Sequence, residues 1–352
     1  MKECTIALAV GEGTGPELAD AFELTVNRFG EIYSVKPRVN RSPRVYGTYF
    51  SVPDRSDRDR ISQLTREDAA HYEDFCREQH LAGVSAVFRT AINAQSLYLV
   101  RQRLLSVKID PLDSESLSIF LVRDQMQGFY TGANSHNGNL VERTFQFSKD
   151  LFDRILSFAL ERARTHWGKD CPDQVLLVYK FHLFDGVLSA WADQLAEKHQ
   201  VDLVLVQPDT ANRNLLGGKL PARSVIVGSN EWADIMHAVL LDRLGLGPQE
   251  GRFSENVYLH PDLRGLAEYQ TVHGSADDIG GKNLVNPTAT VRAAAAIMQR
   301  HGGCPGAVAS MERALADLGE RGIATADLGG TASTTEVVDT LLGLLDRGSG
   351  RP

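Results

Sequence analysis

Short apolar runs that alternate with helical patterns are the feature that most constrains the fold of this chain. Each run is brief and partly β-branched, which is typical of a strand buried in a sheet. The predicted strands are residues 5–10, 83–88, 118–123, 174–179, 201–206 and 224–228. The predicted helices are residues 17–29, 61–80, 95–108, 149–164, 186–198, 231–244, 289–301, 312–318 and 333–345. This alternation predicts an α/β sheet that is covered by helices on both faces.

Composition narrows the class of protein. The chain has 352 residues, a length that suits two lobes, and its net charge of −8 argues against nucleic-acid binding. No apolar stretch is long enough to predict a membrane-spanning helix, and the first apolar run is too short for a signal peptide. The cysteines at positions 4, 76, 171 and 304 form no CxxC pair. We therefore expect a cytoplasmic protein in a reducing compartment, with no membrane partner.

The stretch of residues 272–288 is rich in glycine and polar side chains, and it does not fit a core strand. Gly274, Gly280 and Gly281 let the backbone approach a flat ligand closely. Pro287, followed by a threonine and an alanine-rich run, predicts the start of a helix. From the residues alone, an ordinary loop that caps a helix explains the stretch equally well, because the spacing matches no known phosphate-binding fingerprint.

The same stretch, HGSADDIGGKNLVNPT, resembles the adenosine-binding loop of the isocitrate/isopropylmalate dehydrogenase family, which reads approximately HGSAPDIAGKxxANPTA. Other segments are similar to family motifs in the expected order. They are residues 11–17, 122–132, 179–186, 209–216, 230–235 and 324–338. The resemblance is weak between about residues 35 and 95, where residues 41–60 predict an irregular segment. The chain is identified as a divergent member of this family.

The resemblance implies an α/β fold of the isocitrate/isopropylmalate dehydrogenase type rather than a Rossmann fold. Two lobes would share a mixed sheet, with the active site in the cleft between them. The large cofactor-binding lobe would be discontinuous and consist of residues 1–95 and 250–352. The small lobe, residues 96–249, would carry the dimer interface and the substrate and metal residues. The resemblance also implies a homodimer in which the second subunit contributes a Lys and an Asp to each site.

The activity implied by the resemblance is the NAD-dependent oxidative decarboxylation of a malate-type 2-hydroxy acid, assisted by Mg²⁺ or Mn²⁺. Hydride leaves for the nicotinamide as the hydroxyl loses a proton, and the resulting β-keto acid loses carbon dioxide. By position, Lys180 acts near the hydroxyl and Tyr130 donates a proton to the enolate. Asp209 and Asp234 would be the metal ligands, and Asp209 also counts among the catalytic residues.

The resemblance also assigns residues to the substrate and the cofactor. The substrate residues would be Ser96, Arg101, Arg103, Lys108 and Arg123. The cofactor residues would be Thr14, His273, Gly274, Ser275, Ala276, Asp278, Asn286 and Asp327. Arg123 would grip a substrate carboxylate through its planar fork. Asp278 favours NAD, because an acid beside the ribose accepts hydrogen bonds from a 2′-hydroxyl and repels a 2′-phosphate.

Purely structural interpretations stand beside these roles. Tyr130 lies in a Gly-Phe-Tyr-Thr-Gly run that is typical of a packed aromatic, and Lys180 at a strand end is typical of a solvated charge. Asp234 fits an early-turn carboxylate that faces the helix dipole. Asp278 fits a residue that caps the following turn.

Departures from the family pattern concentrate among the substrate and metal residues. The segment after Ser96 is shorter than in the family and lacks the Arg-Pro pair. Which basic side chain faces the substrate is therefore open among Arg101, Arg103 and Lys108. Ala238 replaces one metal-binding Asp, and His237 and Asp242, which lie nearby in the sequence, are both candidates to substitute for it in part.

Further departures from the family pattern allow two interpretations of the function. Asp124 and Gln127 stand where the family has two glutamates, and His182 stands where it has an asparagine. Either the enzyme acts on a non-standard 2-hydroxy acid of a specialised biosynthetic pathway, or it is a catalytically silent, regulatory relative that binds nucleotide without turnover. Retention of Tyr130 and Lys180 favours the active reading. Ligand binding without redox chemistry is a third class, which no residue supports independently.

Overall fold

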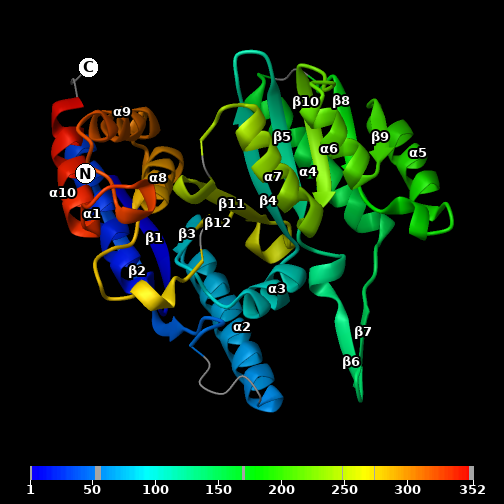
Figure 1. Cartoon of the computed structure of the whole chain (residues 1–352), viewed down its shortest axis with the longest axis horizontal. Coiled ribbons are helices and arrows are strands. Elements are labelled where there is room, and N and C mark those ends of the chain that lie inside the picture. Colours follow the sequence, from blue (N-terminus) through cyan, green and yellow to red (C-terminus); the bar gives the residue numbers. More distant parts are fainter. Residues whose placement is uncertain (1, 52–56, 169–170, 248, 273, 349–352) are drawn as a thin grey trace. The chain divides into compact units, whose positions relative to one another are not determined.

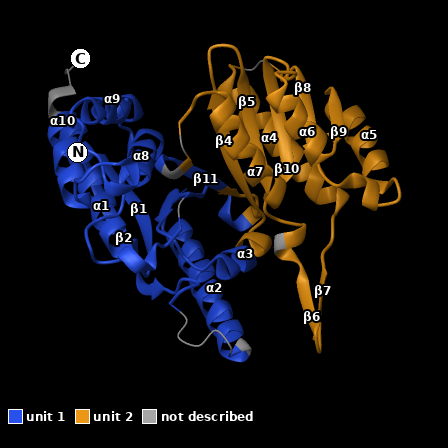
Figure 2. Cartoon of the chain, in the orientation of Figure 1, with its two compact units in different colours: residues 1–100, 250–256, 262–352 blue, residues 101–249, 257–261 orange. Residues whose placement is uncertain are grey.

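The computed structural model describes residues 2–51, 57–168, 171–247, 249–272 and 274–348 (Figure 1). The chain forms two compact units (Figure 2). Unit 1 consists of Met1–Val100, Glu250–Asn256 and Asp262–Pro352, and unit 2 of Arg101–Gln249 and Val257–Pro261. The first boundary lies inside a helix, five residues beyond the predicted limit at residue 95, and residues 257–261 add to the predicted small lobe.

Unit 1 is built on strands in the hydrogen-bonded order β2 (Val35–Tyr46), β1 (Lys2–Gly11), β3 (Ala86–Arg89), β12 (Ala267–Thr271) and β11 (Phe253–Tyr258). One core cluster joins β1 to the helices α1 (Gly15–Tyr33), α8 (Thr288–Ile297), α9 (Ala307–Glu320) and α10 (Thr334–Gly348). Ile6 and Leu8 of β1 belong to it, and so do Phe22 of α1 and Ile297 of α8. These helices therefore form the layer on one face of the unit 1 strands.

The opposite face of unit 1 holds a buried polar network. Ala267 and Tyr269 belong to the core cluster, so Glu268 between them points the other way. There it accepts hydrogen bonds from Arg89 Nε (2.8 Å) and Asn256 Nδ2 (3.0 Å). The hydroxyl of Tyr72, from α2 (Arg58–Leu81), donates to the other carboxylate oxygen at 2.7 Å. Each member thus has a partner, as a buried ion pair requires.

We expect Tyr72→Phe to lower the free energy of unfolding by about 2 kcal/mol, because it leaves a buried carboxylate oxygen without its donor. Tyr49→Phe is the matched control, since Tyr49 is 58% exposed. Urea denaturation measures the free energy of unfolding of both variants. Equal stability of the two variants would show that the hydroxyl of Tyr72 contributes nothing.

Unit 2 has strands in the order β4 (Ser106–Asp113), β5 (Ser118–Asp124), β10 (Arg223–Ser229), β8 (Gln174–Val178) and β9 (Leu203–Val206). β4 is antiparallel to β5, and the other neighbours are parallel. Helices α4 (Lys149–His166) and α5 (Val187–His199) belong to one core cluster, and α6 (Pro208–Leu216) and α7 (Asn230–Arg243) belong to another. Alternate β5 residues fall in different clusters, so helices cover both faces, as the sequence predicted.

The structure corrects several predicted elements. Residues 35–46 form strand β2 at one end of the unit 1 order, where the sequence predicted an irregular segment from residue 41. Its prolines and basic side chains are typical of an edge strand protected from pairing with other chains. The predicted helix 95–108 ends as α3 (Ala94–Arg103), because Leu105 has a left-handed φ of 53°, and Lys108 lies in β4. Strands β11 and β12 and the hairpin β6 (Ala133–Asn137)–β7 (Leu140–Thr144) were not predicted.

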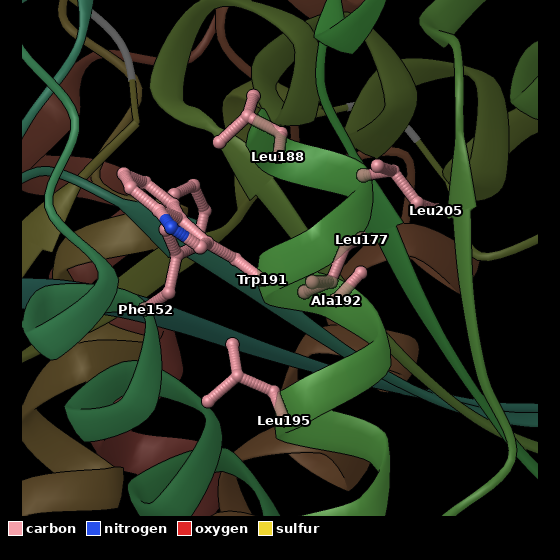
Figure 3. A pocket seen from close by; sticks show the side chains of 7 residues that line it. All are labelled: Phe152, Leu177, Leu188, Trp191, Ala192, Leu195 and Leu205. Atoms are coloured by element: carbon pink, nitrogen blue, oxygen red, sulfur yellow. The ribbon is translucent and has the colours of Figure 1, made fainter. Parts of the chain in front are cut away.

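A small apolar cavity lies between α4, α5, β8 and β9 in unit 2 (Figure 3). It has a volume of about 10 Å³ and is lined by Phe152, Leu177, Leu188, Trp191, Ala192, Leu195 and Leu205. The indole nitrogen of Trp191 is the single polar atom among these seven side chains, too few to orient a ligand or to hold a water molecule by hydrogen bonds. It is a packing gap. Within the part of the chain that the structure describes, no helix is long and apolar enough to span a membrane.

Candidate active site and cofactor loop

The predicted substrate and metal residues gather around the pairing of β4 with β5 in unit 2. Lys108 of β4 lies directly opposite Arg123 of β5. Opposed residues of antiparallel strands point to the same face, and Asp110, two residues after Lys108, shares that face. The neighbours of Arg123 on this face, Ile119 and Leu121, pack in the cluster that contains α7. The three polar side chains are therefore buried on the α7 side.

Arg123 is held by groups of the protein itself. Its Nη1 donates a short hydrogen bond to Asp234 Oδ1, and its Nη2 lies 3.2 Å from His237 Nδ1. Its Nε lies 3.6 Å from Asp110 Oδ2 in an ion pair. Only 3% of Arg123 is exposed. The guanidinium predicted to grip a substrate carboxylate thus already contacts two carboxylates of this chain.

Lys108 is the exceptional member of this cluster. It is 3% exposed, and its ammonium makes no hydrogen bond or ion pair with any residue that the structure describes. Burial, followed by the charge of Arg123, lowers the pKa of Lys108 from 10.5 to about 7, although Asp110 and Asp234 act in the opposite direction. Arg101 adds a further positive charge. Three basic side chains, Lys108, Arg101 and Arg123, therefore lie near the two carboxylates of Asp110 and Asp234.

Helix α3 carries the remaining substrate candidates. Ser96 is 2% exposed, and its hydroxyl has no hydrogen-bond partner among the described residues. Arg101 is buried and Arg103 is exposed. Because the charge of Arg101 also acts on Lys108, Arg101 rather than Arg103 belongs to the basic cluster.

Lys180 and Asp209 are brought together at the carboxyl ends of neighbouring strands. Lys180 follows β8, and Asp209 lies in the first turn of α6 after β9. Lys180 Nζ donates to Asp209 Oδ1 at 3.2 Å and to Gln207 Oε1 at 3.3 Å. The hydrogen bond from Lys180 is the main cause that lowers the pKa of Asp209. The two groups thus form a charged pair on the surface of unit 2.

The donor set of a single chain does not fit a divalent cation. Asp234 is engaged by Arg123, and Ala238, one turn further along α7, offers no ligand atom. Asp242 and His237 do not complete a set, because no group of three or more His, Cys, Asp or Glu side chains among the described residues is placed to hold a metal. We therefore assign no chemical step to a metal ion.

Tyr130 lies in the short 3₁₀ turn Phe129–Thr131. The turn follows Gly128, whose φ of 89° favours glycine. Its backbone is closed by a hydrogen bond from Thr131 N to Gly128 O at 3.2 Å. The side chain of Tyr130 lies outside what the structure describes.

The predicted cofactor loop packs on the N-terminal turn within unit 1. The backbone nitrogen and hydroxyl of Thr14 both donate to Ser275 O, at 3.0 and 2.9 Å. A Cβ on Gly280 would lie 2.7 Å from Gly13 O, so the two backbones touch only because residue 280 has no side chain. Ala276 adopts a left-handed φ of 43°, which is unusual for a residue with a Cβ. The loop is therefore fixed in shape before any ligand binds.

The acidic residue predicted to select NAD remains open to a ligand. Asp278 lies exposed in the short turn Asp277–Ile279. Further along, Asn286 Nδ2 donates to Asp327 Oδ2 at 2.9 Å, which brings together two predicted cofactor residues. Gly274 is exposed, and His273 lies outside the described residues. The loop is thus tightly packed around its glycines and carries an exposed carboxylate at Asp278.

Comparison with known proteins decides the family. A family model described as isocitrate/isopropylmalate dehydrogenase matches residues 88–341. The chain belongs to this family. A 3-isopropylmalate dehydrogenase of Lactococcus lactis is 27% identical over 242 residues, which cover 67% of this chain and 66% of that protein. A 3-isopropylmalate dehydrogenase of Alternaria alternata is 29% identical, over 65% of this chain and 64% of that protein. The chain thus aligns with slightly less than two thirds of the length of these relatives.

A solved structure confirms the family fold. The crystal structure of isocitrate dehydrogenase from Methylococcus capsulatus superposes with a TM-score of 0.68 at 19% sequence identity, covering 98% of this chain and 99% of that one. The predicted isocitrate/isopropylmalate dehydrogenase-like α/β fold is therefore confirmed. Within it, sequence reasoning missed Asp110, whose place beside Arg123 depends on the register of β4 with β5. It also missed Asp277, which accepts a 2.6 Å hydrogen bond from Thr48 behind the cofactor loop.

Proposed function

We propose that this protein is an NAD-dependent dehydrogenase that oxidises and decarboxylates a malate-type 2-hydroxy acid. The observation that most supports this proposal is the environment of Lys108. A buried ammonium with no partner among the described residues, beside Arg101 and Arg123, is costly unless an anion arrives to pair with it. A carboxylate of the substrate supplies that charge, as the two relatives named for 3-isopropylmalate would require of their own substrate.

The cluster also argues for a non-standard substrate. Asp110 and Asp234 already neutralise Arg123, so Lys108 remains the main cation for a substrate carboxylate. An ammonium is a compact point charge and does not reproduce the bidentate grip of a guanidinium. We therefore infer that the group carried beside the shared malate part differs from those of isocitrate and isopropylmalate.

Proton transfer is assigned to Tyr130 and Lys180. NAD, when bound, accepts the hydride from the carbon that bears the hydroxyl. The hydroxyl proton passes to the pair of Lys180 and Asp209, which are 3.2 Å apart: the Lys180 ammonium gives a proton to the Asp209 carboxylate, and the freed amine takes the hydroxyl proton. The bond to the neighbouring carboxylate then breaks, carbon dioxide leaves, and Tyr130 protonates the carbon of the resulting enolate. Ser96 and Arg101 orient the acid.

The test is a screen for NADH formation with a panel of malate-type acids, in the presence of Mg²⁺ or Mn²⁺. The proposal predicts turnover of at least one acid and NAD binding by calorimetry. NAD binding with silence across the whole panel would instead favour the catalytically silent reading. Absence of both would overturn the proposed function.

Cofactor choice is proposed to rest on Asp278. We expect Asp278→Lys to weaken NAD binding and strengthen NADP binding, each roughly tenfold, because it replaces repulsion of the 2′-phosphate by attraction. Calorimetry with both nucleotides measures the change. Asp317→Lys, an equal charge reversal at an exposed site on α9, is the control. Unchanged NAD selectivity in Asp278→Lys would refute the role of Asp278.

A divalent cation is a separate proposal. In a dimer, Asp234 of one subunit and Asp209 of the other would be the ligands of Mg²⁺ or Mn²⁺, and no chemical step is assigned to the ion. Because Ala238 offers no carboxylate, we expect Ala238→Asp to tighten Mn²⁺ binding roughly tenfold by adding ligand charge. Electron paramagnetic resonance measures the concentration of free Mn²⁺ and hence the affinity of each variant for the ion. Ile235→Asp is a control on an exposed position of the same helix, and equal affinities would contradict the assignment.

The homodimer is proposed from the family and from hairpin β6–β7. Almost every residue of this two-stranded sheet is exposed, including Leu140 (54%) and Val141 (60%). An isolated hairpin is only marginally stable in water, so a second chain would stabilise it. Light scattering of the purified protein measures its oligomeric state. A monomer at micromolar concentration would contradict the shared-site proposal.

A further inference from the structure

Two departures from the family pattern, Asp124 and Gln127, lie in direct contact with each other, and Asp124 also contacts Tyr179, on the α4 side of the unit 2 strands. Asp124 ends β5 and points away from Arg123, because successive strand residues face opposite sides. Its carboxylate is completely buried. Oδ1 accepts from Met126 N at 3.0 Å, and Oδ2 accepts from Gln127 Nε2 at 2.8 Å and from Tyr179 Oη at 3.0 Å.

Gln127 is suited to this place by its amide. Its Nε2 donates to Asp124, while its Oε1 accepts from Ser148 N at 2.8 Å, at the start of α4. A glutamate would satisfy Ser148 but would set a second negative charge against the buried carboxylate. The pairing of an acid with an amide therefore explains why position 127 carries no glutamate.

Tyr179 ties the network to the end of β8. It is 1% exposed, and its ring packs edge-on against Phe152 (4.8 Å) and Phe147 (5.6 Å). The hydrogen bond from its hydroxyl to Asp124 fixes the residue that immediately precedes Lys180. On the other side, Asp124 binds residues 126 and 127, which lead directly into the 3₁₀ turn of Tyr130.

We propose that Asp124 is a positioning residue that holds the Tyr130 turn and the Lys180 strand end in one fixed arrangement. One buried carboxylate accepts a donor from each segment, so neither segment shifts without breaking a charge-assisted hydrogen bond. Burial raises the pKa of Asp124 to about 6 against the effect of these hydrogen bonds, and the group is ionised at pH 8. This inference rests on the proposed function, which makes Tyr130 and Lys180 the proton-transfer groups.

The first test is Asp124→Asn in the full chain. The amide keeps the shape but turns one acceptor into a donor, so one of the three hydrogen bonds is lost. We expect kcat to fall roughly 10- to 100-fold, since small misplacements of catalytic groups have effects of this size. The calorimetric Kd for NAD should not change, because the cofactor loop belongs to unit 1. A kcat within twofold of the original protein would overturn the proposal.

An exchange variant separates positioning from simple loss of stability. Asp124→Asn combined with Gln127→Glu swaps the acid and the amide, and restores one donor and one acceptor between them. We expect it to recover most of kcat. Tyr72→Phe is the matched control, because it also removes a buried hydroxyl-to-carboxylate hydrogen bond, in unit 1. An exchange variant as slow as Asp124→Asn, or an equal kcat loss in Tyr72→Phe, would contradict the role.

Hydrogen exchange supplies a readout that does not depend on turnover. Asp124→Asn should speed amide exchange at residues 126–132 and 179–183, whereas Tyr72→Phe should not. If no acid is turned over, the proposed function fails, yet this measurement still decides whether Asp124 fixes both segments. Unchanged exchange in both segments would overturn the inference.

Discussion

Replacing Lys108 by Met is expected to make the protein more stable and much less active. The folded chain gives up the Lys108 proton near pH 7, whereas the unfolded chain keeps it up to about pH 10.5. Between these values the unfolded state binds more protons, so the free energy of unfolding of the original protein rises with pH. Lys108→Met should abolish this rise and add about 1–4 kcal/mol at neutral pH, as replacement of a buried charge often does.

The same substitution removes the proposed partner of the substrate carboxylate. We expect kcat/KM for the acid to fall about 100-fold or more, because a buried charge pair loses one member. The Kd for NAD should be unchanged. Arg103→Met is the control, since it removes an exposed cation from the end of α3. A Lys108→Met variant that keeps its kcat/KM, or that is less stable at pH 7 than the original protein, would contradict this role.

Lys180→Met is expected to reduce kcat by about 100- to 10,000-fold, because general acid–base catalysis contributes effects of this size. The variant also leaves Asp209 without its main hydrogen-bond donor, so the pKa of Asp209 should move back towards its usual value. NADH formation measures kcat, and NMR titration of the carboxyl groups measures the pKa.

The control for Lys180→Met is Lys198→Met, which breaks a comparable exposed ion pair with Asp153. Its kcat should remain within twofold of the original. If the second subunit supplies Lys180, a mixture of Lys180→Met and Lys108→Met chains should recover activity, because each hybrid dimer contains one complete site. No recovery would contradict shared sites, and an active Lys180→Met variant would remove Lys180 from the mechanism.

The fold was largely predictable where the pattern of apolar residues within one segment is sufficient to identify a strand or a helix. The runs at residues 118–123, 174–179 and 224–228 are apolar and β-branched, and they became β5, β8 and β10. Strand β2 was missed because its prolines and charges mask the strand pattern, which an edge position tolerates. The helix predicted through Lys108 was too long, because apolar spacing does not reveal the left-handed residue Leu105.

The candidate site was predictable only as a set of residue types. The sequence identified Arg123 and Lys108, but their direct opposition follows from the register of β4 with β5. Asp124 and Tyr179 are 55 residues apart, so their hydrogen bond depends on β5 and β8 both lying beside β10. The sequence pattern of a single strand does not indicate which residues of another strand lie beside it, because register is set by packing between strands that are distant in the sequence.

Two departures from the family pattern, Asp124 and Gln127, contact each other rather than standing as separate losses. Asp124, Gln127 and Tyr179 share hydrogen bonds, and His237, beside Ala238, contacts Arg123. A site that had only decayed would leave buried polar groups without partners, at a cost in stability. Mutual satisfaction holds for the network of Asp124, Gln127 and Tyr179, although the buried hydroxyl of Ser96 has no partner among the described residues. It is this network that favours a site rebuilt for a different acid over a silent relative.

The most direct test of oxidative decarboxylation is to count both products from one acid. The purified protein is given NAD and an acid labelled with ¹³C at the carboxylate expected to leave, and NADH and labelled carbon dioxide are followed together. We predict that they appear one for one, at equal rates. Formation of NADH without carbon dioxide would show that the protein is a dehydrogenase that does not decarboxylate. If no malate-type acid gave either product, the proposed function would be contradicted.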